Sequence, residues 1–289
     1  MDKNQDLSNG IPKQMQQKQP GIESEMNPEP IFESDGYKGS DKLKGKVALI
    51  TGGDSGIGRA VAVGYAKEGA HIAIVYLDEH EDAEFTKEKV EAYGVNCITI
   101  SGDITDEAFC ISSVERCVAE LGGLDILVNN AAEQHPVNDL RELSDEQLKR
   151  TFATNFYSYV YFTKAALDYL QEGSAIINTS SINAYRGNIS LIDYTSTKGA
   201  ITAFTRSMAQ SLAEKKIRVN SIAPGPIWTP LIPASFDEEK VSQFGQNTLM
   251  GRPGQPSELV GAYVLLASED SSYMTGQAIH INGGDYISS

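Results

Sequence analysis

Cysteine is scarce in this sequence of 289 residues, and its three copies are not placed to work together. Cys97, Cys110 and Cys117 form no CxxC pair, and no histidine stands at a spacing typical of a metal site. Free cysteine is most often a small buried apolar residue. We therefore expect three reduced, buried thiols in an intracellular chain, with no metal centre.

Long apolar runs are lacking as well. None approaches the roughly 20 residues that a membrane span requires, and the N-terminal stretch MDKNQDLSNGIPKQMQQKQP has no apolar core of the kind found in signal peptides. Positive charge is also in deficit, since 24 basic residues against 39 acidic ones give a net charge of −15. Nucleic acids and anionic membranes are bound by clustered Lys and Arg, so we expect neither as a partner. A cytoplasmic location follows by elimination.

Residues 1–42 differ in composition from the rest of the chain. They contain four prolines and five glutamines, and no aromatic residue occurs before Phe32. Such a segment cannot bury enough apolar surface by itself to offset the entropy of ordering it. Two interpretations remain open: a disordered tail, or an extended arm that docks on the body or on a neighbouring subunit.

From Lys46 onward, short apolar runs alternate with segments of helical periodicity. Uninterrupted apolar strands separated by helices are typical of a parallel sheet with helices on both faces. Residues 43–289 are therefore predicted to form one α/β domain, a doubly wound, Rossmann-like parallel sheet in three layers. Long helices are expected at 145–170 and 194–214, and strands at 46–51, 71–76, 96–101, 124–130, 174–181, 218–223 and 278–283.

A glycine cluster follows the first of these strands. In VALITGGDSGIGRAVAVGYA, Gly52, Gly53, Gly56 and Gly58 lie between the strand and a helix. Glycines let main-chain N–H groups approach a ligand closely, and a helix N-terminus favours a phosphate. A glycine cluster alone also suits a tight turn, but the first strand–helix turn of a doubly wound domain is where dinucleotides bind. The spacing is G-x-x-x-G-x-G, and not the commoner G-x-G-x-x-G.

A serine, a tyrosine and a lysine form a second candidate site. Tyr194 and Lys198 are four residues apart, and so they share one face of a helix. A nearby ammonium lowers the pKa of a phenol, whose ordinary value is about 10. Ser181 ends the fifth strand, at the sheet edge where ligands of such folds bind. We interpret Tyr194 as a general acid–base and Ser181 as a group that holds a carbonyl or alcohol oxygen.

At this point the sequence closely resembles the short-chain dehydrogenase/reductase family, in its single-domain branch, from about Leu43 to Tyr286. Six motifs match in the family's order. They are T-G-x-x-x-G-x-G at 51–58, Asp103 in GDIT, NNAA at 129–132 with Ala132 in place of the family's glycine, Asn155 in TFATNFYS, S-x₁₂-Y-x-x-x-K at Ser181, Tyr194 and Lys198, and P-G-x-I-x-T at 224–229.

The resemblance implies hydride transfer between the nicotinamide of NAD(P) and a carbonyl or alcohol carbon. Tyr194 would move the proton, and Lys198 would lower the pKa of Tyr194 and hold the nicotinamide ribose. Ser181 would position the substrate, and Asn155 would support a water relay. It also implies a homotetramer. The implied cofactor-binding residues are Gly52, Asp54, Ser55, Gly56, Ile57, Gly58, Tyr76, Leu77, Asp103, Ile104, Asn129, Asn130, Ala131, Tyr194, Lys198, Pro224, Gly225, Ile227 and Thr229.

The choice between NAD and NADP depends on the residues that face the adenine ribose. Ser55 stands where NADP-using relatives often carry arginine, and Asp54 adds negative charge. Tyr76 stands where NAD enzymes often carry an acid, and Asp78 follows two residues later. We expect Arg59, in the first turn of the helix, to be solvated. These features favour NAD over NADP.

Other functions are weighed against this one. A non-catalytic NAD(P)-binding regulatory protein would leave the Ser–Tyr–Lys–Asn set idle, and a nucleotide-sugar epimerase would need a larger C-terminal domain. The long segment 228–256 is expected to act as a lid, with Trp228, Leu231 and Phe236 either lining a substrate pocket or packing the lid down. His135 is interpreted as a surface loop residue. No feature identifies the substrate among alcohols, aldehydes, ketones, sugars and acyl chains.

Overall fold

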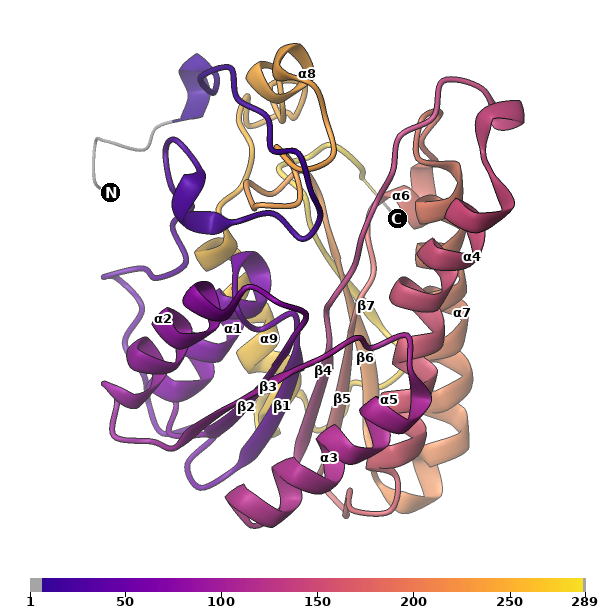
Figure 1. Ribbon diagram of the computed structural model, residues 1–289. Coiled ribbons are helices and arrows are strands. Elements are labelled where there is room, and N and C mark those ends of the chain that lie inside the picture. The colour runs from indigo at the N-terminus through magenta and orange to yellow at the C-terminus, as the bar shows by residue number, and fades with distance from the viewer. Residues whose placement is uncertain (1–6, 288–289) are drawn as a thin grey trace.

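A seven-stranded parallel sheet forms the centre of the molecule (Figure 1). The computed structural model describes residues 7–287. The strand order is β3-β2-β1-β4-β5-β6-β7, so the chain reverses direction across the sheet between β1 and β4. This confirms the predicted doubly wound α/β fold. The strands are β1 Val47–Thr51, β2 His71–Tyr76, β3 Cys97–Ser101, β4 Ile126–Asn129, β5 Ala175–Thr179, β6 Arg218–Pro224 and β7 Ala278–Ile281.

Helices cover both faces of the sheet, and every residue of β1, β4, β5 and β6 is buried between them. One apolar core lies under α1 Gly56–Lys67, α2 His80–Glu91 and α9 Val260–Ala267. The other lies under α3 Glu107–Leu121, α5 Ser158–Ala166 and α7 Ile192–Leu212. The remaining helices are α4 Asp145–Phe152, α6 Asn183–Arg186 and α8 Glu238–Ser242. Among residues 7–287, none of the helices is both long and apolar enough for a membrane span.

All three cysteines are buried and free. Cys97 belongs to the first core, and Cys110 and Cys117 belong to the second. Burial raises the pKa of each thiol to about 12. Because a thiol is a nucleophile or a ligand only when it is deprotonated, these side chains act here as apolar packing groups.

The helix predicted at 145–170 is not uniform. α4 ends at Phe152, a π-helical turn occupies Ala153–Tyr157, and α5 then continues to Ala166. Ser144 caps the start of α4 by accepting a hydrogen bond from the amide of Gln147 at 3.1 Å. A π-helical turn inserts one extra residue into a helix and is often found at functional sites. Here it contains Asn155.

Residues 7–42 run along the surface of the domain (Figure 1). We call this segment the arm. Its isolated apolar residues Leu7, Ile11 and Met26 are buried against the segment that follows β6, where they pack with Trp228 and neighbouring side chains. The indole N–H of Trp228 donates a hydrogen bond to the main-chain carbonyl of Pro28 in the arm, at 2.8 Å. Trp228 therefore packs the post-β6 segment against the arm.

Candidate active site

A cleft of about 290 Å³ opens at the carboxyl ends of the strands, where the strand order reverses between the neighbours β1 and β4. Its walls come from the loops that follow β1 to β6, and this is the place where ligands of doubly wound folds bind. Most of the predicted cofactor-binding residues line it. They are Gly52, Asp54, Ser55, Gly56, Ile57, Tyr76, Leu77, Asp103, Ile104, Asn130, Ala131, Tyr194, Lys198, Pro224, Gly225, Ile227 and Thr229.

The glycine loop is shaped by two close approaches of the backbone. Gly56 begins α1 with φ +52°, a conformation that favours glycine. A Cβ atom on Gly58 would lie 1.8 Å from the carbonyl oxygen of Gly52, so the start of α1 can pack against the loop only with glycine there. Gly58 does not line the cleft but fixes the loop that does.

Asn129 was expected at the cofactor, and the structure places it elsewhere. It is fully buried, and its side chain donates to Oδ1 of Asn178 on the neighbouring strand at 2.9 Å. Asn178 in turn donates to Oγ1 of Thr205 on α7 at 2.9 Å. Because successive side chains of a strand point to opposite faces, Asn129 points into the layer under α5 and α7 while Asn130 reaches the cleft. The expected contact of Asn129 with the cofactor therefore stays a prediction, and in this structure its side chain lies in the core beside β5.

Tyr194, Lys198 and Ser181 meet at the floor of the cleft. The Lys198 Nζ donates to the carbonyl of Thr179 at 2.8 Å and lies 5.4 Å from the centre of the Tyr194 ring. Ser181 lines the cleft together with Tyr194, and its Oγ accepts a hydrogen bond from the Asn183 amide at 3.1 Å. The Ser180 hydroxyl instead donates to the Lys198 carbonyl at 3.1 Å. The geometry therefore brings together the three residues selected from the sequence.

The pKa of Tyr194 differs from the expectation. Burial raises the pKa of its hydroxyl to about 12, and the nearby Ser181 hydroxyl only partly opposes this. Burial also lowers the pKa of the Lys198 ammonium, to about 7. The expected lowering of the Tyr194 pKa is therefore not seen in the protein without cofactor.

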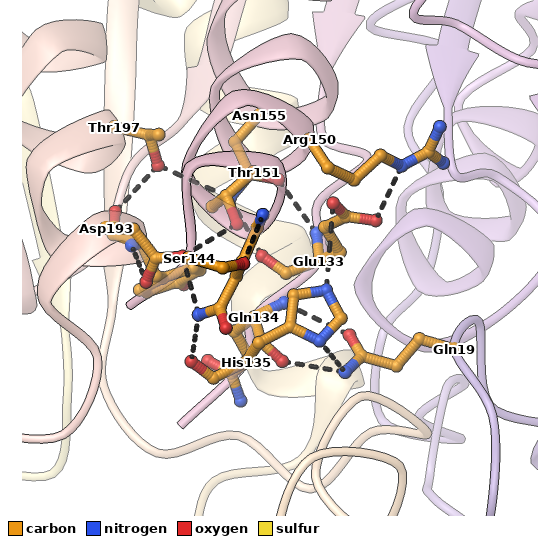
Figure 2. Close-up of polar contacts among 12 residues, drawn as sticks. Gln19, Glu133, Gln134, His135, Ser144, Arg150, Thr151, Asn155, Asp193 and Thr197 are labelled. Carbon is orange, nitrogen blue, oxygen red and sulfur yellow. Dashed lines mark hydrogen bonds and ion pairs between the residues drawn. The ribbon is translucent and has the colours of Figure 1, made fainter. Parts of the chain in front are cut away.

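Asp193 was not noticed in the sequence, yet it fixes the start of α7 (Figure 2). This buried carboxylate accepts hydrogen bonds from the Tyr194 amide at 2.8 Å, from Oγ1 of Thr151 at 2.8 Å and from Nε2 of Gln147 at 3.0 Å. It thereby ties the start of α7, at the residue before Tyr194, to α4. An acidic residue in the first turn of a helix, next to a candidate catalytic residue, is the signal that could have found it.

Asn155 does not line the cleft, but it holds a loop that does (Figure 2). Its Oδ1 accepts from the Glu133 amide at 2.8 Å, and its Nδ2 donates to the Glu133 carbonyl at 2.8 Å and to Oγ1 of Thr197 at 3.3 Å. Both ends of the carboxamide are therefore used by one residue of the loop after β4. The π-helical turn presents Asn155 toward that loop.

An ion-pair chain joins Asp103, in the loop after β3, to the same loop after β4. Arg150 Nη1 lies 2.8 Å from the Asp103 carboxylate, and its Nε lies 3.3 Å from the Glu133 carboxylate. Arg150 holds the pKa of the Asp103 carboxyl below its ordinary value, although partial burial opposes this. Arg150 and Glu133 both line the cleft, and neither was singled out in the sequence because their partners lie in other loops.

The region beside the glycine loop is rich in acid. Burial raises the pKa of Asp54 to about 6 and that of Glu79 to about 7. Lys18 of the arm lies 3.1 Å from the Glu79 carboxylate and 3.7 Å from that of Asp78. Arg59, expected in solvent, is buried and forms ion pairs with Glu23 and Asp82. That expectation is wrong because its carboxylate partners lie in the arm and in α2.

The segment after β6 contributes apolar walls. Leu231 and Phe236 line the cleft, whereas Trp228 is fully buried against the arm. His135 lies at the rim with its Nδ1 3.4 Å from Nε2 of Gln19, and it does not line the cleft. The segment after β6 therefore contributes apolar side chains to the wall of the cleft.

Comparison with known proteins agrees with this geometry. A family model described as enoyl-(acyl carrier protein) reductase matches residues 52–285. General stress protein 39 of Bacillus subtilis (strain 168) is 69% identical over 277 residues, which cover 96% of this chain and 97% of that protein. NADPH-dependent aldehyde reductase 1, chloroplastic, of Arabidopsis thaliana is 51% identical over 282 residues, 95% of this chain and 98% of that protein.

Among solved structures, a short-chain dehydrogenase from Burkholderia cenocepacia J2315 in complex with NADP superimposes with a TM-score of 0.80. It is 30% identical in sequence, and the match covers 84% of this chain and 98% of that one. The part of this chain outside the match is comparable in length to the arm and its flanking residues.

Proposed function

The chain belongs to the short-chain dehydrogenase/reductase family, and from this premise we propose how its own residues perform an NAD(P)-dependent oxidoreductase reaction. The family resemblance noted in the sequence is confirmed, and with it the class of reaction, hydride transfer between a nicotinamide cofactor and a carbonyl or alcohol carbon. The names of the relatives give no support to a non-catalytic role.

The residues present fit a bound dinucleotide. The cleft runs without interruption from the glycine loop to Tyr194, and Gly58 allows the backbone approach that a pyrophosphate site requires. We propose that the glycine loop holds the pyrophosphate, Asp103 and Ile104 the adenine, and Lys198 the nicotinamide ribose. When bound, the cofactor supplies or accepts the hydride, and its oxidised ring carries a positive charge.

Three side chains carry the proton chemistry in this proposal. Ser181 holds the substrate oxygen, and Tyr194 donates the proton to it during reduction or removes it during oxidation. Lys198 stabilises the phenolate across the 5.4 Å to the ring. The observation that carries the proposal is the meeting of Tyr194, Lys198 and Ser181 at one end of a cleft whose other end is the glycine loop.

Asn155 acts indirectly. Its carboxamide is occupied by the Glu133 backbone, so we propose that it positions the loop after β4 and supports proton exchange with solvent from there. Asp193 is likewise a positioning residue: it accepts a hydrogen bond from the main-chain amide of Tyr194 and so helps to fix the place of that tyrosine.

A panel of small aldehydes, ketones and sugars with NADH and NADPH tests this function. We expect consumption of the reduced cofactor with stoichiometric formation of the alcohol from at least one carbonyl class. Cofactor binding without turnover of any carbonyl in a broad panel would contradict it. Substrates should be small, because the dinucleotide and the substrate share a cleft of about 290 Å³.

We propose NAD as the preferred cofactor. The acidic groups Asp54, Asp78 and Glu79 oppose a 2′-phosphate, and Arg59 is engaged in buried ion pairs. Against this, Lys18 brings one positive charge to the same region, and one relative is named as NADPH-dependent. The ratio of kcat/KM for NADH to that for NADPH should exceed one and should fall in Ser55→Arg. A ratio well below one in the parent protein would overturn this preference.

We propose that the protein assembles as a homotetramer. Tyr157 on the π-helical turn is 46% exposed, and Ile189 and Tyr273 are almost fully exposed, which suits surfaces that pair with other copies. Light scattering during size-exclusion chromatography should give about four times the chain mass. A stable monomer at micromolar concentration would contradict it.

A further inference from the structure

One short part of the arm crosses the mouth of the dinucleotide cleft and is held at both ends. We call residues 18–23 the clasp. Gln19 binds the loop after β4, and Glu23 binds the glycine loop after β1. Residues of both loops line the cleft, at the switch point of the sheet. Figure 1 shows the arm on this side of the molecule, beside the segment that carries α8.

The first anchor is a pair of hydrogen bonds from one carboxamide. Nε2 of Gln19 donates to the Gln134 carbonyl at 2.7 Å, and the Gln134 amide donates to Oε1 of Gln19 at 3.1 Å. The preceding residue, Glu133, is held in the same two-bond manner by Asn155. Figure 2 shows Gln19 and Asn155 on different sides of this loop, each hydrogen-bonded to one of its two consecutive residues. The loop after β4, which lines the cleft, is therefore fixed both by Gln19 of the arm and by Asn155.

The second anchor is a buried carboxylate. Glu23 accepts a hydrogen bond from the Gly56 amide at 2.5 Å and forms an ion pair with Arg59. Arg59 also donates to the Asp54 carbonyl at 2.9 Å, so that Glu23 and Arg59 together hold the glycine loop from outside. The Glu23 amide donates to the Asp82 carboxylate at 2.9 Å, which fixes the backbone of the clasp as well.

The middle of the clasp forms part of the cleft wall. Gln19, Pro20 and Gly21 line the same cleft as the glycine loop and Tyr194. Gly21 packs tightly against the segment after β6, because a Cβ atom there would lie 2.5 Å from the Pro230 carbonyl oxygen. The clasp therefore contacts three of the loops that surround the cleft.

We propose that the clasp is part of the dinucleotide site of this chain: residues 18–23 close over the bound cofactor, and the cofactor leaves only when the clasp opens. This inference rests on the proposed function, since it needs a dinucleotide in the cleft. Gln19 and Glu23 are positioning residues in it, and the Gln19–Gly21 backbone contacts the cofactor. The rival explanation is that the arm only stabilises the domain.

A steric variant with a matched control separates the two explanations. Gly21→Ala removes no polar group but forces the clasp away from Pro230. Gly36→Ala places the same methyl group in the same arm, where its nearest neighbour is 3.6 Å away. The measurement is the rate constant for release of NADH and of NADPH, from stopped-flow fluorescence on displacement by excess oxidised cofactor, with the full-length protein.

We expect Gly21→Ala to release the cofactor at least about tenfold faster than the parent, and Gly36→Ala to match the parent within about twofold. Gln19→Ala should accelerate release by about 10- to 30-fold, because two hydrogen bonds of ordinary net strength are lost. Unchanged release in both Gly21→Ala and Gln19→Ala would refute the clasp while leaving the proposed function intact. Failure of the parent protein to bind either dinucleotide would refute both.

Hydrogen exchange is a second measurement. If the arm only stabilised the domain, the cofactor would not change the exchange rates of the arm amides. The amides of Gln16, Ile22 and Glu23 donate to acceptors in the arm or on the body, so each reports whether the clasp is closed. Saturating cofactor should slow their exchange in the parent and in Gly36→Ala, and much less in Gly21→Ala. Equal exchange with and without cofactor in the parent would overturn the proposal even if the release rates differed.

Discussion

Lys198 is expected to be required for turnover and to lower the stability of the fold. Its ammonium is buried, and burial lowers its pKa from 10.5 to about 7. Its hydrogen-bond acceptor is the Thr179 carbonyl at 2.8 Å, and in the described part of the chain no carboxylate forms an ion pair with it. Replacing it by methionine keeps the length of the side chain and removes the charge.

The sign of the effect follows from proton linkage. A lysine whose pKa is lower in the folded than in the unfolded protein binds fewer protons in the folded state between the two values, here from about pH 7 to 10.5. The free energy of unfolding therefore rises with pH across that window. At 1.36 kcal/mol per pKa unit, the penalty at pH 7 is about 4 kcal/mol, and about 3 kcal/mol of it disappears by pH 9.5.

Lys198→Met should accordingly be more stable than the parent at pH 7, by at least about 1 kcal/mol. The lost hydrogen bond reduces the gain, but the Thr179 carbonyl also accepts from the Tyr159 hydroxyl at 3.3 Å and is not left without a partner. Between pH 7 and 9.5 the unfolding free energy of the parent should rise by about 3 kcal/mol relative to that of Lys198→Met, so the advantage of the variant should shrink or reverse.

The assay is urea unfolding at fixed protein concentration and several pH values, without cofactor. Lys164→Met is the control, because the Lys164 side chain is 71% exposed and the same substitution there should give a gap that does not depend on pH. Parallel stability curves for the parent and Lys198→Met over this range would refute the claim that the active-site ammonium is desolvated.

Three further substitutions test other parts of the site. Gly58→Ala should raise the cofactor Kd at least about 100-fold or prevent folding, because its Cβ would lie 1.8 Å from the Gly52 carbonyl oxygen. Gly261 has open space around it, so Gly261→Ala should bind the cofactor normally in the same fluorescence titration. Asn155→Ala removes the partners of the half-buried amide and carbonyl of Glu133, so it should lower the unfolding free energy by about 1–3 kcal/mol and reduce kcat. Urea unfolding and steady-state kinetics measure the two effects; unchanged values of both would contradict the role given to the π-helical turn. Arg150→Met should raise the cofactor KM a few-fold with little change in kcat. The rise in KM should be larger at low than at high ionic strength, because the ion pair of Arg150 with Asp103 is partly exposed and screened by salt. A rise in KM that does not depend on salt would argue against this role of the ion pair.

The strands and the order of the motifs could be predicted because they depend on local pattern. An apolar run such as VALIT is buried on both faces in a parallel sheet that helices cover. The glycine spacing could be interpreted from the turn after that strand alone, without knowledge of distant segments. The same holds for Tyr194 and Lys198, whose spacing alone puts them on one face of α7.

The features that escaped prediction depend on contacts between distant segments. Arg59 was expected in solvent because its partner Glu23 lies 36 residues upstream, in a segment with no periodicity. A π-helical turn keeps nearly the same apolar pattern as an α-helix, and therefore the break at Ala153 left no signal. The raised pKa of Tyr194 depends on burial of the phenol, which residue spacing does not reveal.

The arm shows the same limit in another way. Leu7, Ile11 and Met26 are single apolar residues in a polar segment, and no periodicity links them. Their burial depends on the surface presented by Trp228 and its neighbours after β6. Composition left open whether this segment docks on the body, because the docking surface is built by residues some 200 positions later.

The central claim is that the Tyr194 hydroxyl carries the proton of the reaction, and Tyr194→Phe tests it most directly. Tyr185→Phe is the matched control, since within residues 7–287 the buried Tyr185 hydroxyl has no hydrogen-bond partner. With a substrate from the carbonyl panel, Tyr194→Phe should keep its cofactor Kd within a few-fold and lose at least about 10²-fold in kcat, while Tyr185→Phe stays near the parent. A Tyr194→Phe protein that turns over as fast as the parent would contradict the account.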